Sequence, residues 1–391
     1  MVTTGVLGGR WRAHVTPWGA VEPWDGGPVL DWYVAADDRW HTPRLEPAVR
    51  QRRVDGTAVV ETRVRIPDGD AVQRIWSVPE HGGLTLVEIE NVSPLPIAIA
   101  LSHGAVLSAR PLNAPIEGID VPAEAVAFPI GHHASVTVAL PHTRHAPAVL
   151  PGPIPPVAGV VRGWTATAER AGRLLLPDET LAERLVAARC ELALAGPCDA
   201  ADDPWGFVLG VAQLVRMGER ADGWVPDLAA AMERGARHDA GDWAVGAALD
   251  AAELVLHRAG EERALRDIER LRGTVAGAGP QAVPAPTEPP DEPGRLLGWI
   301  EGLLARRGAL LPRGIPESWR GANFEVYGLP TGPVSTVAFA VRWHAARPAV
   351  LWEQEGGPIE LSAPVVAPAW SSTEPAGEAL WPEPDGASGG V

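Results

Sequence analysis

Carboxylates that stand beside tryptophan are the residues of this 391-residue chain best suited to chemistry. Asp203 is one proline away from a tryptophan, Trp205, and Asp239 and Asp242 lie on either side of a glycine just before Trp243. An indole ring can stack on a sugar ring, and it also desolvates a neighbouring carboxyl group, which raises the pKa of that group. Two carboxyl groups roughly 5 to 9.5 Å apart can cleave a glycosidic bond. The two tryptophans and Asp203 are therefore candidate substrate-binding residues, and Asp239 and Asp242 are candidate catalytic residues.

The same acids also stand where helices are expected to begin, which gives them a simpler role. Asp before Pro, as at Asp203, is a favoured helix start, because the carboxylate accepts hydrogen bonds from backbone N–H groups of the first turn. Helix capping is the alternative interpretation of both Asp203 and Asp242. Of the two, Asp242 is the stronger candidate for chemistry, with Asp239 as its companion.

Glu325 is a candidate catalytic partner from another part of the chain. It lies between Gly321 and Gly328, in a segment where aromatic and polar residues mix. Loops of this kind often carry functional residues. The alternative is that the segment only joins two domains.

Tryptophan is abundant, with 16 residues beside 2 Tyr and 4 Phe, and five of the 16 fall within the first 40 positions. These five stand among Pro, Gly, Asp and Arg rather than in apolar runs, as Trp24 does. Such a residue either closes the end of a sheet or forms a platform for a sugar, so Trp24 is a candidate substrate-binding residue. Trp and Arg are also preferred anchors of protein interfaces, so a protein partner is an alternative to a carbohydrate.

Metal and cofactor motifs are weak. Cys190 and Cys198 are too few for a four-ligand zinc site. His142 and His145, with His132-His133, have no Cys, Asp or Glu at ligand spacing. The chain has no P-loop, no GxSxG and no dinucleotide fingerprint in its strand and helix context. We therefore expect no metal and no cofactor.

Charge and hydropathy exclude several classes of protein. A net charge of −16 without an arginine-rich stripe disfavours nucleic-acid binding. No run of 18 apolar residues is present, and the N-terminus has no signal-peptide pattern, so we expect no membrane span and a cytoplasmic location. Hydrophobic residues make up 46%, enough for the large cores of two or three domains.

Residues 1–175 have the alternating pattern of β-strands. Apolar residues alternate with Glu and Arg over 60–66, and alternation on both sides of Asn91-Val92-Ser93-Pro94 predicts a hairpin over 84–102. Further strands are expected near 28–34, 71–78, 104–109 and 134–140. Without helical patterns between them, these strands indicate an antiparallel β-sandwich. The proline-rich segment 146–160 is predicted to be an extended connection.

Residues 176–310 change to a helical period. Asp178 and Gly196 are expected to bound the first helix, and Asp203 and Gly218 the second. More helices are expected near 226–236, 243–258, 261–272 and 295–306, with a proline-rich linker over 276–293. Short loops between them predict stacked helical hairpins.

Alternation returns over 311–381, where Val337 to Trp343 and Ala349 to Glu353 predict a second hairpin within a small β-domain. Residues 382–391 are expected to be a disordered tail. The predicted fold class is therefore α+β and multidomain.

This order of domains resembles the six-hairpin glycosidases, which run from a β-sandwich into an (α/α) toroid and a small β-domain. Leu86–Asn91 with Ser93-Pro94 is similar to their sandwich, and Gly241-Asp242-Trp243 resembles a loop of the rhamnosidase-like and debranching-enzyme-like members. Val341–His344 with Arg347–Glu353 is similar to their closing sheet. The resemblance implies a protein that hydrolyses or binds carbohydrate, with Asp242 as general acid or base and Asp239 or Glu325 as its partner.

The helical region supplies only about half the hairpins of a complete toroid. A shortened toroid is expected to lack one carboxylate of the catalytic pair. It therefore favours a non-hydrolytic relative as strongly as it favours an enzyme. The alternative function is a catalytically inactive relative that serves as a protein-interaction scaffold.

Overall fold

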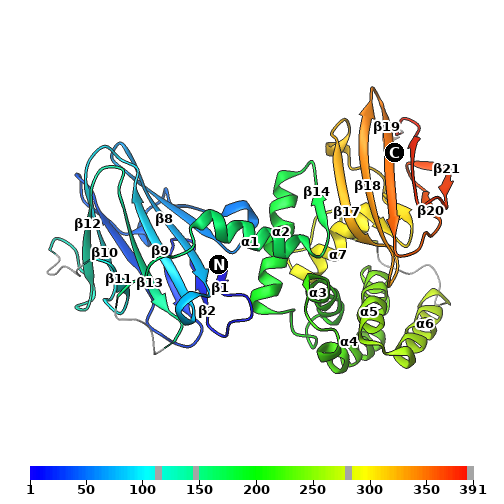
Figure 1. The fold of residues 1–391 in the computed structure, drawn as a ribbon, viewed down its shortest axis with the longest axis horizontal. Helices are drawn as coiled ribbons and strands as arrows, with labels where there is room; N and C mark the ends of the chain where they lie inside the picture. The colour runs from blue at the N-terminus through cyan, green and yellow to red at the C-terminus, as the bar shows by residue number, and fades with distance from the viewer. Residues whose placement is uncertain (111–116, 144–148, 278–283, 385–391) are drawn as a thin grey trace. The chain divides into compact units, whose positions relative to one another are not determined.

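The structure is a computed structural model that describes residues 1–110, 117–143, 149–277 and 284–384. These residues form mainly antiparallel sheets together with helices, an α+β architecture (Figure 1). The chain divides into two compact units, the first formed by Met1–Thr165 with Ala193–Ala195 and the second by Ala166–Leu192 with Gly196–Val391. The predicted helical domain and C-terminal β-domain fall mainly in the second unit.

Three sheets make up most of the first unit. Their strand orders are β1-β2-β3, β12-β10-β4-β5 and β11-β13-β9-β8-β7-β6. The strands are β1 (Val2–Gly5), β2 (Arg12–Val15), β3 (Val21–Pro23), β4 (Trp32–Ala35), β5 (Trp40–His41), β6 (Arg50–Arg53), β7 (Val60–Ile66), β8 (Gly69–Val78), β9 (Leu84–Asn91), β10 (Ile97–Leu101), β11 (Leu107–Ser108), β12 (Val126–Ile130) and β13 (Ser135–Pro141). Side chains of the four- and six-stranded sheets share one core, with Ile99 and Phe128 from one sheet and Ile75 and Ile89 from the other.

The predicted hairpin over 84–102 is wrong, although both of its strands exist. β9 pairs with β8 and β13, whereas β10 pairs with β4 and β12, so the turn after Asn91 carries the chain from one sheet to another. The Asn91 side chain holds this crossing by donating to the carbonyl oxygens of Leu95, at 2.8 Å, and Gly131, at 3.2 Å. Alternation correctly identifies the buried face of β9 and that of β10. Apolar residues of both strands lie in the same core, although the strands belong to different sheets.

A helix begins inside the segment predicted to be extended over 146–160. Helix α1 (Val157–Glu169) starts beyond its prolines, and residues 144–148 lie outside the described part. Val161 of α1 joins Trp76 and Leu86 in a second core of the first unit. The helix therefore covers an apolar face of the six-stranded sheet.

Local sequence signals place the next helices correctly. Asp178 caps the start of α2 (Glu179–Ala195), and Asp203 with Pro204 begins α3 (Pro204–Met217), which ends at Gly218 in a left-handed conformation. The remaining helices are α4 (Val225–His238), α5 (Val245–Ala259), α6 (Glu262–Gly277) and α7 (Pro293–Leu304). Among the described helices, none is long and apolar enough to cross a membrane.

Helix α3 is the centre of the helical region. All of its residues are buried, and it contacts α4, α5 and α7. A helix that is apolar on every side is stable only when other elements cover it. Its core partners include Leu228 of α4 and Leu249 of α5.

Two sheets complete the second unit, in the orders β14-β17-β18-β19-β22 and β15-β16-β20-β21. Their strands are β14 (Arg173–Leu175), β15 (Ala305–Arg306), β16 (Ala309–Leu310), β17 (Phe324–Pro330), β18 (Thr336–His344), β19 (Arg347–Glu355), β20 (Leu361–Ala363), β21 (Ala367–Ser372) and β22 (Ala376–Leu380). The predicted hairpin is confirmed as β18 and β19, which pair from His344 and Arg347 outward. Most of the predicted tail, residues 385–391, lies outside the described residues, as does 278–283 of the predicted linker.

Candidate ligand-binding site

Two of the predicted acids meet at one arginine, Arg295 of α7. Arg295 Nε and Nη2 donate to the two carboxylate oxygens of Asp203, at 2.6 and 2.8 Å, and Nη1 lies 3.1 and 3.0 Å from the two oxygens of Asp242. The guanidinium carbon lies 5.9 Å from the ring centroid of Trp243, in range of a cation–π contact. These side chains form what we call the Arg295 cluster: Asp203, Asp242, Trp243 and Arg295.

Asp203 caps α3, whereas Asp242 binds the backbone just before α5, a helix without a side-chain cap. Asp203 Oδ1 accepts from the backbone N–H of Gly206 at 2.9 Å, and Asp242 Oδ1 accepts from that of Ala244 at 2.7 Å. Burial alone would raise the pKa of Asp203, but the hydrogen bonds from Arg295 and from the helix backbone outweigh it and lower that pKa. The Asp203 carboxylate is therefore ionised at neutral pH, which suits a structural anion and not a general acid.

Acidification is expected to weaken the fold through Asp203. Because its pKa is lower in the folded protein than in the unfolded chain, this carboxylate stabilises the protein above the unfolded pKa, about 3.9, and the contribution is lost as the pH falls through the folded value. Chemical unfolding of the wild type and of Asp203→Asn should therefore differ most near pH 7 and converge toward pH 2. An equal difference at every pH would contradict this assignment.

The other predicted residues occupy different environments. Trp205 is 1% exposed, lies in the helical core and donates its indole N–H to the backbone oxygen of Asp239 at 3.0 Å, so its ring offers no face to a sugar. Glu325, on β17, accepts from Tyr327 and Arg342, and these two hydrogen bonds lower its pKa. Trp24 is 47% exposed and belongs to the first unit.

Cys198, Asp203 and Glu292 are the one group among the described residues with ligand atoms close enough to hold a metal ion, within 4.8 Å of one another. Arg295 already neutralises Asp203, and the Glu292 oxygens accept from the first backbone N–H groups of α7 at 3.0 and 2.6 Å. Burial, then the two carboxylates, raise the pKa of Cys198 to about 12, so its thiol stays protonated. These contacts describe helix caps beside a half-buried thiol. His145 of the predicted histidine group lies outside the described residues.

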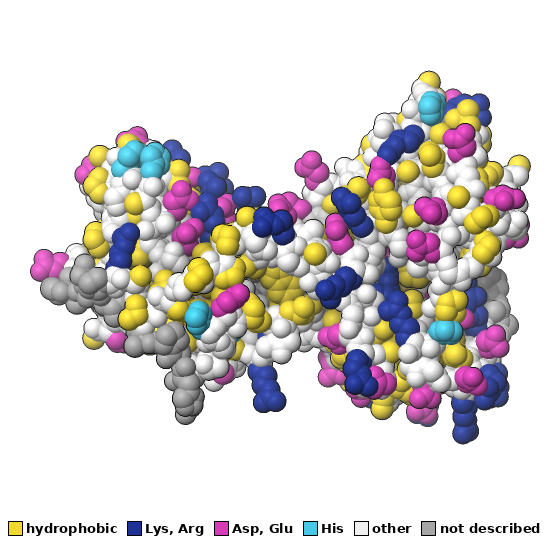
Figure 2. All heavy atoms as spheres, viewed as in Figure 1, with side chains coloured by type: hydrophobic (Ala, Val, Ile, Leu, Met, Phe, Trp, Pro, Cys, Tyr) yellow, Lys and Arg dark blue, Asp and Glu magenta, His cyan; other side chains and the backbone are white. Residues whose placement is uncertain are grey.

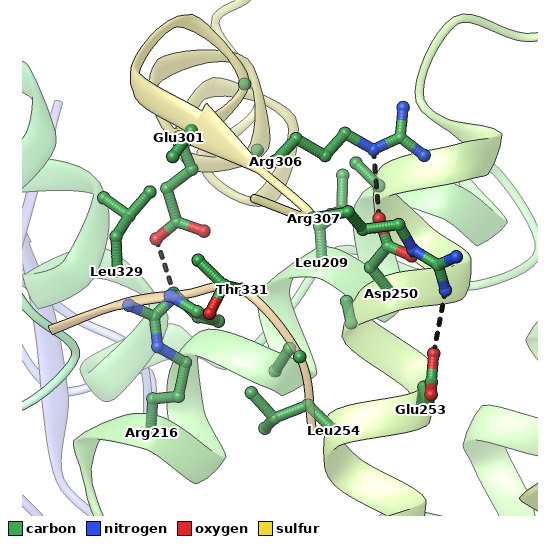
Figure 3. Close-up of a pocket in the computed structure, with 18 of the residues that line it drawn as sticks. Leu209, Arg216, Asp250, Glu253, Leu254, Glu301, Arg306, Arg307, Leu329 and Thr331 are labelled. Atoms are coloured by element: carbon green, nitrogen blue, oxygen red, sulfur yellow. Dashed lines mark hydrogen bonds and ion pairs between the residues drawn. The ribbon is translucent and has the colours of Figure 1, made fainter. Parts of the chain in front are cut away.

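A pocket of about 320 Å³ lies in the second unit between α3, α5, α7 and the end of β17 (Figure 3). We call it the Glu301 pocket. Leu209, Leu254 and Leu329 give it apolar walls, and small residues such as Gly298 of α7 leave the space between the helices open. This volume is at the lower end of the range for small-molecule sites.

Glu301 reaches into this pocket from α7 and is held by buried cations. Its Oε1 accepts from Arg216 Nη1 at 2.6 Å and from Gln213 Nε2 at 2.8 Å, and Arg189 Nη2 lies 3.8 Å away. The Arg216 and Arg189 side chains are only 6% and 1% exposed. Burial, then the positive charge of Arg216, lower the pKa of Arg189 to about 10, so the Arg189 guanidinium group remains charged at neutral pH.

The opposite wall carries a second set of ion pairs, on α5. Asp250 accepts from Arg306 at 3.0 Å and from Arg307 at 2.6 Å, while Arg307 also reaches Glu253 at 3.1 Å (Figure 3). Arg272 of α6 donates to both acids as well, to Asp250 at 2.7 Å and to Glu253 at 2.9 Å. Acids and arginines thus alternate around this rim.

The β15–β16 turn positions these arginines. Arg307 has φ 47° and Gly308 has φ 83°, the positive values that a two-residue type I′ hairpin turn requires at both positions. A non-glycine residue in this conformation is uncommon, and its ion pairs with Asp250 and Glu253 hold it there.

Two buried polar atoms that line the Glu301 pocket have no hydrogen-bond partner among the described residues. They are Oε1 of Gln213 and Oγ1 of Thr331, on side chains 3% and 6% exposed. Thr331 lies between Glu301 and Leu254 in the view of this pocket (Figure 3). Leaving such an atom unpaired costs about 1–3 kcal/mol, so these positions are suited to the polar groups of a ligand.

Sequence reasoning missed this pocket, although one signal was present. Gln213 and Arg216 are the polar side chains of α3, a helix that is otherwise apolar and is completely buried. Polar side chains in such a helix need partners from other elements.

No model of a known protein family matches the chain, and no curated protein matches it.

Proposed function

We propose that the second unit binds a small polyhydroxylated ligand of the sugar class in the Glu301 pocket. The observation that carries this proposal is the pair of unpartnered buried atoms, Gln213 Oε1 and Thr331 Oγ1, beside the Glu301 carboxylate. A sugar hydroxyl both donates and accepts hydrogen bonds, so it suits an amide oxygen, a hydroxyl and a carboxylate together. The lining contains equal numbers of acids and arginines, which favours a ligand part without net charge.

Recognition in this pocket would rest on hydrogen bonds instead of stacking, because none of its lining residues is aromatic. The tryptophans proposed from the sequence lie elsewhere, and Trp243 faces the guanidinium of Arg295. We therefore propose that the ligand is bound in the Glu301 pocket and is not hydrolysed at the Arg295 cluster. A general acid needs a carboxyl that is protonated near neutral pH, whereas the pKa of Asp203 and that of Glu325 are both lowered.

The six-hairpin resemblance remains part of this proposal. The shared core of the four- and six-stranded sheets supports a β-sandwich, and the helices packed around α3 support a shortened helical domain with a closing sheet. The abundance of Trp and Arg leaves a scaffold that binds a protein partner as the alternative function. A cytoplasmic location remains a prediction from the sequence.

Thr331→Val tests the proposal because it removes a hydroxyl at nearly constant volume. Calorimetric titration of the wild type with hexoses and disaccharides should show binding that this variant weakens about tenfold. Thr373→Val, at an exposed threonine outside the pocket, is the matched control and should bind as the wild type does.

Two results would overturn the proposal or part of it. Wild-type protein that binds no sugar in the panel removes the carbohydrate ligand, and equal affinity in Thr331→Val removes the site. Chromogenic glycosides, assayed with the wild type and Asp242→Asn, test turnover separately. Hydrolysis that is lost in Asp242→Asn would restore the catalytic interpretation of the Arg295 cluster.

A further inference from the structure

A second hollow of about 540 Å³ lies beside the Glu301 pocket and is rich in arginine. We call it the Arg258 hollow. It is formed by the end of α1 and the residues after it, by the end of α5, and by the turn between β17 and β18. Figure 2 shows arginine side chains gathered where the surface is hollowed between the C-terminal sheet and the helices. Its charged lining residues are Glu169, Arg170, Arg173, Arg216, Arg258 and Glu355.

The positive charge of this hollow is only partly neutralised. Arg173 pairs with Glu169 at 3.3 Å, and Arg216 pairs with Glu301 at 2.6 Å. Arg170 and Arg258, by contrast, have no carboxylate within 4.0 Å among the described residues. Arg170 follows α1 and Arg258 lies near the end of α5, so the lining brings together two guanidinium groups from distant parts of the chain.

Arg258 is held in place although it has no anionic partner. Its Nη1 donates to the backbone oxygen of Val215 at 2.9 Å, which fixes one end of the guanidinium group. Burial, then the positive charge of Arg216, lower the pKa of Arg258. The cations therefore repel one another, and a bound anion would relieve that repulsion. Ser335 and Thr336 add hydroxyl donors to the same lining.

The Glu301 pocket and the Arg258 hollow adjoin, because part of their lining is the same. They share Arg216 and Leu254 from the helices and Pro330, Gly332 and Pro333 from the β17–β18 connection. A ligand in the Glu301 pocket can therefore place a substituent near Arg258. The Glu301 pocket has a balanced lining, whereas the Arg258 hollow is lined by four arginines and two glutamates, and one of these arginines, Arg216, is paired with Glu301.

We propose that the Arg258 hollow is an oxyanion site that binds the phosphate or carboxylate group of the same ligand, so that the ligand is a sugar phosphate or a sugar acid. The sugar half of this statement rests on the function proposed above, whereas the oxyanion half rests on the unpaired arginines alone. Guanidinium groups bind both kinds of oxyanion through charge-assisted hydrogen bonds.

The oxyanion site is tested first with inorganic phosphate and with acetate, by thermal unfolding and calorimetric titration. Chloride at equal ionic strength corrects for screening. One of the two anions should raise the melting temperature of the wild type and bind at millimolar concentration. The double variant Arg170→Gln/Arg258→Gln should lose at least tenfold in affinity, and Arg263→Gln, at an exposed arginine of α6 outside the hollow, should lose nothing.

The identity of the ligand is tested next with glucose, galactose and mannose, with their monophosphates and with the corresponding uronic acids. Phosphate binding with tighter binding of a monophosphate than of its parent sugar supports a sugar phosphate, and acetate with uronic acids supports a sugar acid. Failure of both anions, or unchanged affinity in the folded double variant, overturns the oxyanion site. Anion binding without any sugar binding leaves the oxyanion site standing and removes the sugar from the proposed function.

Discussion

Replacing Arg295 with methionine is expected to lower the free energy of unfolding by about 3 kcal/mol in urea denaturation. The reason is that Arg295 is the shared partner of Asp203 and Asp242, whose side chains are only 19% and 22% exposed. Without it, two partly buried carboxylates lose their counter-ion and face each other. The substitution also disconnects the start of α7 from the start of α3.

Three further variants separate this charge effect from the loss of side-chain packing. Arg295→Lys keeps the charge but not the forked geometry, so it should fall between the wild type and Arg295→Met. In the Asp203→Asn/Asp242→Asn background, Arg295→Met should cost much less, because the carboxylates that need it are gone. Arg263→Met, at an exposed position of α6, should change stability by less than about 0.5 kcal/mol. A loss for Arg295→Met no larger than that of Arg263→Met would contradict the structural role of the cluster.

Replacing Glu301 with alanine is expected to have an equal or larger effect, about 3–5 kcal/mol. Glu301 is the anion that faces Arg189 and Arg216, and neither guanidinium group can reach water easily. Its removal leaves two buried positive charges close together and takes an acceptor from Gln213. Urea denaturation of purified variants measures the loss.

The matched variants for this prediction differ in charge and in location. Glu301→Gln keeps the acceptor oxygen but not the charge, so its loss should be about half that of Glu301→Ala. Glu183→Ala, at an exposed glutamate of α2, should be nearly neutral. If Glu301→Ala is as stable as Glu183→Ala, the buried arginines do not depend on this carboxylate.

The parts of the fold that were predictable depend on signals a few residues long. Asp178 and Asp203 each cap a helix within three residues of themselves, and Gly218 ends α3 in a conformation that glycine favours. The β18–β19 hairpin is local as well, since its strands are joined by a two-residue turn after His344. Such features need no knowledge of the rest of the chain.

The parts that were not predictable depend on distant pairings. Alternation shows which side of β10 is buried but does not say that its partners are β4 and β12 instead of β9. Arg295 lies 92 residues from Asp203 and 53 from Asp242, so no local pattern connects them. The Glu301 pocket takes its walls from three helices and a strand end, and its unpartnered atoms are defined only once these elements have packed.

The complete burial of α3 has a consequence for synthesis of the protein. The ribosome releases α3 before α5 and long before α7, the helices that cover its sides. Until Leu304 has emerged, an apolar helix remains without its cover, and the carboxylate of Asp203 remains without its arginine. The second unit therefore cannot complete its core until the last of these helices has been synthesised, and α3 is open to aggregation through that interval.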